Sequence, residues 1–309
     1  MNEALQRVLA APLDPGGRLF WGWLLGAFAL AAAVWVAGER RRHEQGFLSW
    51  LFAPRLWLHP STFVDLQVGV ARLALAPGRW FAGWVGVAMA AHGVALALDL
   101  TVGPRPLAEI TPVMAGLYAL ALLLANDLAM YLNHRLHHAV PVLWRFHALH
   151  HSAEVLTPLT SLLHHPVYDV SRMLLRAAIA GPLMGVVAWL WTGAALPLQI
   201  LGVNALRVAF LASTSNLRHS HVPLRFGPIL GRVFSSPSQH HLHHSRAPAD
   251  HNCNYGVIFA LWDAALGTLK LPQSGESWAF GLDGEVPHRN LVDAWLRPFA
   301  EARRLLSSR

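Results

Sequence analysis

Long apolar stretches dominate the first two thirds of the chain and predict membrane-spanning helices. A transmembrane helix needs about 20 consecutive, mostly apolar residues. Five stretches approach this requirement, and they lie near Leu19–Gly38, Trp80–Leu98, Pro112–Leu132, Leu174–Trp191 and Ala194–Ala212. The last two could instead form a re-entrant hairpin, because Gly181, Pro182 and Pro197 interrupt them. The pattern predicts an all-α fold, a multi-span transmembrane bundle of about four to five spans.

The remainder of the chain, from Ser213 onward, is mixed and polar. Its one apolar run, Tyr255–Leu269, is too short and too interrupted to be a confident span. No internal repeat is visible, so we expect one membrane domain with a cytosolic, histidine-rich helical cap. We divide the chain into an N-terminal membrane anchor region with two spans (1–110), a histidine-bearing region (111–270) and a C-terminal cytosolic tail (271–309).

Composition agrees with a membrane protein, since 54% of the residues are hydrophobic and 13% are charged. The formal net charge of +7 could suggest a nucleic-acid partner, but the basic residues flank apolar stretches, so we expect no nucleic acid. The single cysteine, Cys253, cannot form an internal disulfide, which fits a reducing cytoplasm. The first apolar stretch lacks a small-residue cleavage site after it and is expected to be a retained anchor.

Arginines give the expected orientation in the membrane. Short cytoplasmic loops are enriched in Lys and Arg, and residues 40–42 are three consecutive arginines, which places the end of the first span in the cytoplasm. Counting five spans onward puts Thr101–Ile110 and the Thr192-Gly193 turn outside. All the histidine clusters then lie on the cytoplasmic face of an integral, multi-pass membrane protein.

The 19 histidines are concentrated in three groups with helical spacing. The groups are His134, His137 and His138; His147, His150 and His151; and His240, His241, His243 and His244. Residues three and four apart share one face of a helix, so each group can direct two or three imidazoles to one point. Neutral imidazole binds iron, zinc, copper or nickel, and so many ligands exceed the need of one ion. The pattern predicts two metals, rather than solvated helices.

Residues around these groups resemble the fatty acid hydroxylase and sterol desaturase superfamily. The segments that carry the resemblance are DLAMYLNHR (127–135), LWRFHALHHS (143–152) and PSQHHLHHS (237–245), followed by Asn254-Tyr255-Gly256 and Trp262-Asp263. The likeness runs from about Leu117 to Lys270, and order, spacing and flanking residues all agree. It implies a di-iron catalytic domain over 111–270, with the two irons held by histidines at the cytosolic end of the bundle.

The resemblance also implies a role for individual residues. The expected metal ligands are His134, His138, His147, His150, His151, His219, His221, His240, His243 and His244. Of these, His219 and His221 occupy the place of one or two ligands before the last motif, and we place His221 slightly ahead. Asp127, His165, Asn254 and Asp263 are expected to support the ligands, and no catalytic residue is expected apart from the metal centre. His137 and His241 should point away from the metals, and His164 should support the site or lie at the surface.

The function implied is that of an oxidoreductase that uses O2 to hydroxylate or desaturate an unactivated C–H position of a lipid from the bilayer. Electrons would come from a separate protein of the ferredoxin, cytochrome or flavoreductase type. Two alternatives stay open, a histidine-rich membrane metal transporter and a zinc-dependent membrane lipid hydrolase. Transport would require ligands near the midplane of several spans, and a hydrolase would pair about three ligands with a carboxylate base. Neither the lipid nor an oligomeric state is predicted.

Overall fold

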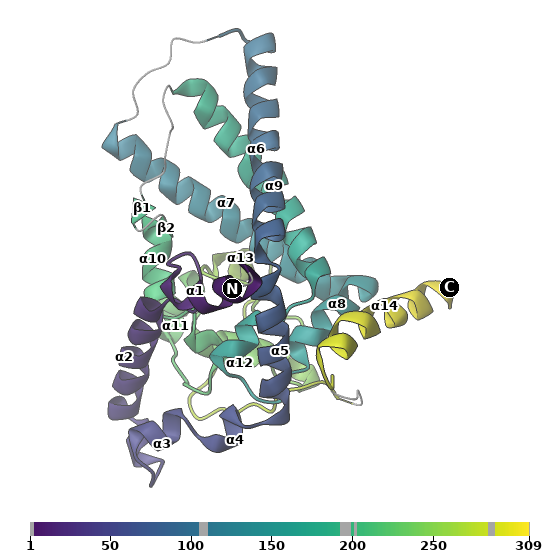
Figure 1. The fold of residues 1–309 in the computed structure, drawn as a ribbon. Helices are drawn as coiled ribbons and strands as arrows, with labels where there is room; N and C mark the ends of the chain where they lie inside the picture. Colours follow the sequence, from purple (N-terminus) through teal and green to yellow (C-terminus); the bar gives the residue numbers. More distant parts are fainter. Residues whose placement is uncertain (1–2, 105–110, 192–198, 201–202, 284–287, 309) are drawn as a thin grey trace.

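The structure is a computed structural model that describes residues 3–104, 111–191, 199–200, 203–283 and 288–308 (Figure 1). The longer helices are α1 (Glu3–Ala10), α2 (Trp21–Ala37), α5 (Pro60–Ala74), α6 (Ala76–Thr101), α7 (Pro112–Ala139), α8 (Pro141–His151), α9 (Pro166–Leu190), α10 (Ala205–Ala212) and α14 (Leu291–Ser307). Shorter helices are α3 (Phe47–Leu51), α4 (Pro54–Trp57), α11 (Gly227–Val233), α12 (Pro237–His243) and α13 (Leu261–Ala265). The described residues include one antiparallel pair, β1 (Gln199–Ile200) with β2 (Val203–Asn204), so the expected helical fold is confirmed.

Proline and side-chain caps define where several of these helices begin. α7, α8, α9 and α12 all have proline as their first residue, where the missing N–H costs nothing. Before α12, the Ser236 hydroxyl accepts the Gln239 N–H while the Gln239 side chain accepts the Ser236 N–H. This reciprocal capping fixes the start of a short helix that carries three histidines.

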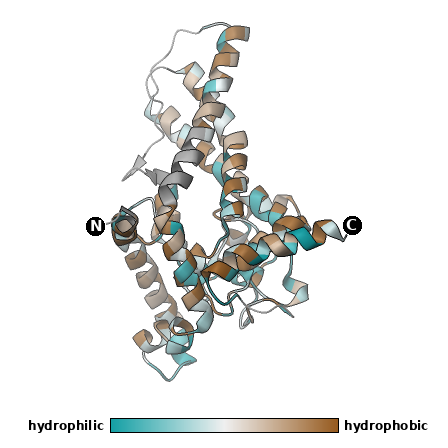
Figure 2. Cartoon of the chain, turned by 45° about the vertical axis from the view of Figure 1, so that its right-hand side comes forward, coloured by the Kyte–Doolittle hydropathy of each residue, from teal (hydrophilic) through white to brown (hydrophobic). Residues whose placement is uncertain are grey.

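Two of the described helices, α7 and α9, are long and apolar enough to cross a membrane. Apolar residues cover most of the helices that project from the body of the protein (Figure 2). α2 and the Gly86–Thr101 part of α6 are shorter apolar helices in the places of the first two predicted spans. α9 runs unbroken through Gly181 and Pro182, so it is not half of a re-entrant hairpin.

The expected fifth span, Ala194–Ala212, is not a continuous helix. Residues 199–204 contain the β1–β2 pair, and α10 has 8 residues, about 12 Å of helix, which is too short to cross a bilayer. Residues 192–198 and 201–202 lie outside the described part of the chain. Pro197 and Gly202 in this apolar stretch both disfavour a helix, a signal that hydropathy alone does not weigh.

α6 and α9 pack closely along each other through small residues (Figure 1). A Cβ atom at Gly185 would lie 2.5 Å from the Ala91 carbonyl oxygen, and one at Gly181 would lie 2.6 Å from the Ala90 Cβ. The two glycines are four apart, the small-residue spacing that brings membrane helices into backbone contact. This contact fixes α9, whose first turns reach the histidines.

The body of the protein below these helices is held by packing around the histidine elements. α14 packs on α8, and the 3-10 turn η3 (Pro158–Leu162) packs on α5. One apolar core joins Val64 and Val68 of α5 to Leu149 of α8 and Ala294 of α14. These contacts bring the expected C-terminal tail against the helix that carries the middle histidine motif.

Candidate metal centre

The structure brings nine histidines together in two adjacent groups. The first histidine group contains His134, His138, His147, His151 and His243. The second histidine group contains His150, His219, His240 and His244. Within each group, one nitrogen of every residue lies within 4.8 Å of the corresponding nitrogen of every other. All of these side chains except His138 are buried.

The two HxxHH motifs divide their rings between the groups in opposite senses. In α8, His147 and His151 join the first group, while His150 faces the second. At α12, His240 and His244 join the second group, while His243 faces the first. Positions i+3 and i+4 lie about 100° apart around the helix axis, on opposite sides of position i, so one short helix can serve two adjacent points. The repeated motif therefore predicts two sites rather than one.

Backbone carbonyls orient several of the rings. Nδ1 of His134 lies 3.0 Å from the Tyr255 oxygen, Nδ1 of His150 lies 3.0 Å from the Leu163 oxygen, and Nδ1 of His243 lies 2.6 Å from the Cys253 oxygen. A carbonyl can only accept, so each Nδ1–H donates and each Nε2 keeps its lone pair. Fixing the outer nitrogen in this way is the usual support of a metal-bound imidazole.

The inward nitrogens are arranged as metal ligands would be. The Nε2 atoms of His134, His138 and His243 are buried and have no hydrogen-bond partner among the described residues. In the second group, Nε2 of His219 lies 3.1 Å from Nε2 of His150 and 2.9 Å from that of His240. Nitrogens bound to one ion at about 2.1 Å are separated by roughly 3.0–3.5 Å. The residues present therefore fit a metal ion in each group.

Burial keeps these rings neutral, which is the form that binds metal. Burial is the first cause that lowers the pKa of His150, to about 3, and it holds the pKa of His147, His244 and His219 well below the usual value. Neighbouring histidines add to the effect on the last three, since two positive rings repel. The donor set is all-nitrogen, which suits iron, zinc, copper or nickel.

The structure separates His219 from His221. His219, in the 3-10 turn η4 (Leu217–His219), joins the second group. His221 lies outside both groups, and its ring meets that of Trp50 edge-on at 4.7 Å. Burial lowers the pKa of His221 to about 4. The structure therefore favours His219 as a metal ligand, contrary to the slight preference for His221, because the turn that ends at His219 directs the two side chains apart.

Asp127 does not contact a histidine as expected, but secures a loop beside them. Its carboxylate accepts the backbone N–H groups of Ile258 and Phe259, at 2.9 and 3.1 Å, and the Trp262 indole N–H at 3.0 Å. The two-turn spacing predicted that Asp127 and His134 lie on the same face of the helix. The Asp127 carboxylate nevertheless accepts its hydrogen bonds from N–H groups of another segment. Asp127 thus ties α7 to the segment that leads into α13.

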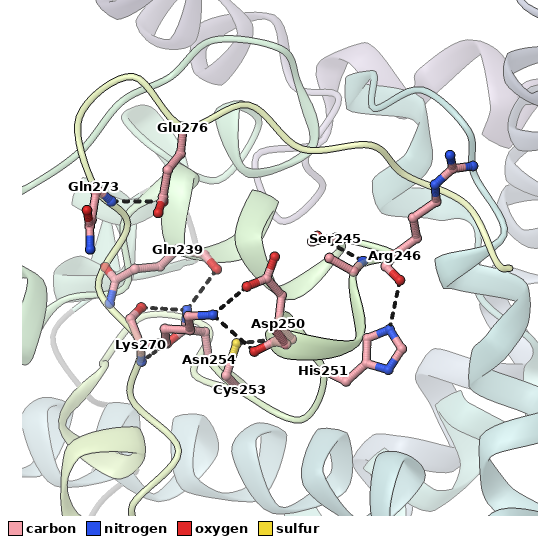
Figure 3. A network of polar contacts seen from close by, with 12 residues as sticks. Gln239, Ser245, Arg246, Asp250, His251, Cys253, Asn254, Lys270, Gln273 and Glu276 are labelled. Atoms are coloured by element: carbon pink, nitrogen blue, oxygen red, sulfur yellow. Dashed lines mark hydrogen bonds and ion pairs between the residues drawn. The ribbon is translucent and has the colours of Figure 1, made fainter.

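Asp263 and Asn254 support the histidines through the backbone. Asp263 accepts the N–H groups of Tyr255 and Gly256, and the Tyr255 carbonyl orients His134. Asn254 has a positive φ of 54° and donates from its side chain to the carbonyls of Gln239 in α12 and Lys270 (Figure 3). Both residues therefore brace the segment around the last histidine motif.

Arg218 is a buried arginine that sequence reasoning did not include in the site. Its guanidinium donates to the Ser235 hydroxyl, to the carbonyls of Val257 and Gly256, and to Nδ1 of His240 at 2.9 Å. Only 2% of the residue is exposed. It therefore fixes the His240 ring and joins η4 to the last motif. Its position next to His219 was the only signal in the sequence.

The neighbouring residues His164 and His165 have different contacts. His165 caps α9 by accepting the Val167 N–H on Nδ1, and its Nε2–H donates to the Trp295 carbonyl of α14, so it holds helices together rather than contacting the two groups. His164, in contrast, stacks on His150. His137 bonds to the Asn133 carbonyl and His241 to the Leu217 carbonyl, and neither joins a group, as expected.

A cavity of about 400 Å³ opens onto both groups. Its walls include His138, His151 and His243 of the first group and His244 of the second. Trp144 and Arg246 also line it. Small molecules therefore have a route from the surface to both metal positions.

A sequence model named fatty acid hydroxylase matches residues 119–268, which include every residue of both groups. This region is therefore similar to the fatty acid hydroxylase family. The chain is 34% identical over 196 residues to the ornithine lipid hydroxylase OlsE of Rhizobium tropici, a match covering 62% of this chain and 53% of that protein. It is 29% identical over 159 residues to the alkylglycerol monooxygenase of Caenorhabditis elegans, covering 51% and 28%. The chain thus spans about half the length of the former relative. No solved structure matches the chain.

Proposed function

We propose that this protein is a membrane-bound di-iron oxygenase that hydroxylates a lipid. The observation that carries the proposal is the convergence of nine imidazoles in two adjacent groups inside a fatty acid hydroxylase region. The names of both relatives, a hydroxylase and a monooxygenase, favour hydroxylation over desaturation. The family and the two apolar helices support a lipid taken from the bilayer.

Iron at the two groups would supply the activation of O2 needed to oxidise an unactivated C–H bond. The first group would hold one iron through His134, His138, His147, His151 and His243. The second would hold the other through His150, His219, His240 and His244. These are the ten expected ligands without His221.

The protein's own contribution is to orient the ligands and limit water. The carbonyls of Tyr255, Leu163 and Cys253 hold three rings with Nε2 inward, so little reorganisation is needed when metal binds. Burial of the rings excludes bulk water, which would otherwise quench a reactive oxidant. The cavity beside His138 and His244 supplies the opening through which O2 would enter.

The source of electrons and the orientation in the membrane belong to the same proposal. We infer that electrons come from a separate donor protein of the ferredoxin, cytochrome or flavoreductase type. The three arginines at 40–42 support a cytoplasmic position for the histidines, because such clusters stay inside. In this orientation the donor would dock on the cytoplasmic face.

The test is metal analysis of protein purified anaerobically in detergent, beside a His147→Ala, His150→Ala, His151→Ala variant. We expect about two irons per chain, and loss of both in the variant, because the three rings serve both groups. Oxygen consumption and a lipid product of increased mass (+16) should then require reductant. Iron that survives the triple change would refute the assigned site. One tightly held zinc, with lipid hydrolysis, would favour the hydrolase alternative.

A further inference from the structure

The last helix, α14, has an exposed apolar stripe along its outer side. α14 packs on α8 and α5, and its buried residues are Ala294, Pro298 and Ala302. A different side of the helix carries four large apolar side chains that remain exposed, namely Val292 (64%), Leu296 (63%), Phe299 (52%) and Leu306 (63%). These four positions are i, i+4, i+7 and i+14, so they lie within about 80° of the helix circumference. We call these four residues the α14 stripe.

The α14 stripe lies beside the start of α9, one of the two described helices that are apolar enough to cross a membrane. The Phe299 ring centroid is 5.1 Å from that of Phe146 in α8 and 5.2 Å from that of His165, which caps α9. From there α14 runs obliquely to the pair of α6 and α9, and its C-terminal end extends beyond the body of the protein (Figure 1). A helix in this position can lie along a membrane surface while α9 crosses the membrane.

The charges of α14 leave its C-terminal half positive. Its two acidic residues are already in ion pairs, Asp293 with Arg297 and Glu301 with Arg145. Arg303 and Arg304 are exposed, and neither has an ion pair among the residues that the structure describes. Arg303 is at position i+11 from Val292 and therefore lies within the α14 stripe. Two positive charges in and beside the stripe are thus available to an anionic partner.

These properties fit a lipid bilayer better than a protein partner. A basic helix with one apolar side is typical of helices that lie in the interface between membrane and water. The core of a protein–protein interface is depleted of charged residues, whereas Arg303 lies within the stripe. In a bilayer the aliphatic part of an arginine can lie among acyl chains while its guanidinium reaches the headgroups. The cytoplasmic leaflet is rich in anionic headgroups, which attract such arginines.

We propose that α14 lies in the surface of the bilayer on the same face of the membrane as the histidine groups, with the α14 stripe among the acyl chains and Arg303 and Arg304 on anionic headgroups. The inference does not depend on a bound metal. α14 packs on α8, which carries His147, His150 and His151, so this attachment holds the middle histidine motif next to the bilayer. The C-terminal helix is then an element of the membrane surface rather than a free cytosolic tail.

The experiment measures membrane depth by spin labelling of the full-length protein in nanodiscs of phosphatidylcholine and phosphatidylglycerol. A nitroxide is attached to Leu296→Cys or Leu306→Cys in the stripe, and to Arg304→Cys as the matched control. Arg304 is two residues before Leu306 but about 160° away from it around the helix axis. Cys253 is buried, and the unaltered protein taken through the same labelling measures any background. Because Leu296 and Leu306 are each 63% exposed, their replacement leaves the packed core intact.

We expect oxygen, which concentrates in the bilayer, to reach the labels of the stripe, and a water-soluble nickel chelate to be excluded from them. The ratio of oxygen to nickel collision rates should be at least about threefold higher at positions 296 and 306 than at 304, because an interfacial helix buries its apolar side roughly 5–10 Å deep. Equal ratios at the three positions, with nickel reaching all of them, would overturn the proposal. Labels at 296 and 306 that are shielded from both reagents would also overturn it, and would indicate a protein partner or a second copy of the chain.

The charge of the lipid tests the two arginines. In nanodiscs of phosphatidylcholine alone, the oxygen-to-nickel ratio at Leu296→Cys should fall about twofold, because the attraction to anionic headgroups is lost. The double change Arg303→Gln, Arg304→Gln should remove this difference between the two lipid compositions, whereas Arg232→Gln, at an exposed position of α11, should keep it. The same ratio in both compositions would overturn the contact with headgroups. These measurements need no iron, so failure of the proposed oxygenase leaves their outcome unchanged.

Discussion

The ring of His164 stacks on that of His150, with centroids 4.0 Å apart and an angle of 25° between the planes. His164 belongs to neither group, but it covers one face of a proposed ligand. The Leu163 carbonyl, one residue earlier, receives the Nδ1–H of the same ring. The segment after η3 thus fixes His150 in two ways, through its backbone and through the adjacent side chain.

Replacing His164 by alanine should weaken the second metal site without removing it. Loss of the stacked ring lets His150 rotate, and residues that orient ligands typically contribute 10–100-fold to metal affinity. We expect about two irons per chain at saturating iron, but faster loss of one to a chelator. His251→Ala, at an exposed loop, is the control. A chelation rate equal to that of the unaltered protein would contradict this role.

His219 and His221 offer a matched pair of substitutions. His219→Ala removes one of four nitrogens from the second group, so the iron content should fall from about two to about one per chain. His221→Ala should retain both irons, because that ring contacts Trp50 instead. Elemental analysis of the two purified variants checks both expectations. Loss of iron in His221→Ala alone would reverse the assignment.

Asp263→Asn should reduce both stability and metal binding. The change replaces an oxygen that accepts the Tyr255 or Gly256 N–H by an amide that cannot, which costs about 1–3 kcal/mol. His134 is then held less firmly, because its partner is the Tyr255 carbonyl. Thermal unfolding in detergent and iron titration measure the two effects. Asp283→Asn, whose side chain is 65% exposed, should change stability by less than about 0.5 kcal/mol.

Asp65 predicts a stability that depends on pH. Burial raises the pKa of Asp65 to about 7, and the Thr160 hydroxyl donates the hydrogen bond that opposes this shift. The folded state therefore holds this proton more tightly than the unfolded state, whose pKa is 3.8. The contribution is present below pH 3.8 and is lost as the pH rises toward 7. Asp65→Asn should unfold several degrees above the unaltered protein at about pH 8, with a smaller difference at about pH 5. A difference independent of pH would contradict the assignment.

Gly185→Ala tests the contact between α6 and α9. The new Cβ would meet the Ala91 carbonyl oxygen at 2.5 Å, so the helices must separate, at a cost of about 1–3 kcal/mol. Gly93→Ala, in α6 with nothing near the new Cβ, should be neutral or stabilise by up to about 1 kcal/mol. Thermal unfolding of both variants in one detergent makes the comparison. Equal effects would mean that the glycine spacing does not set the packing.

Local pattern was sufficient where the signal lies within one helix. The HxxxH and HxxHH spacings placed His134 with His138, and the two HxxHH motifs indicated more than one metal position, because helical periodicity fixes which side chains share a face. Hydropathy likewise located α7 and α9. The prediction of a span in the apolar stretch around α10 was wrong. Hydropathy measures only the average polarity of a window, whereas proline and glycine within the window affect whether a helix continues.

Contacts between distant segments were beyond the sequence. His219 and His221 are two residues apart, and only the path of the chain after η4 decides which one meets His150. The role of Asp127 was also misjudged, because its partners are 131 to 135 residues away. Such relations require the tertiary fold.

The two histidine groups differ in the length of chain that separates their residues. Four of the five rings of the first group lie between His134 and His151, on the hairpin of α7 and α8, while the second group takes three of its four rings from His219 onward. Closing a long loop costs more entropy than closing a short one. The first group can therefore form as soon as α7 and α8 pair, whereas the second must wait until the polypeptide beyond α9 folds back. A chain interrupted during synthesis after α8 would already carry most of one site and almost none of the other.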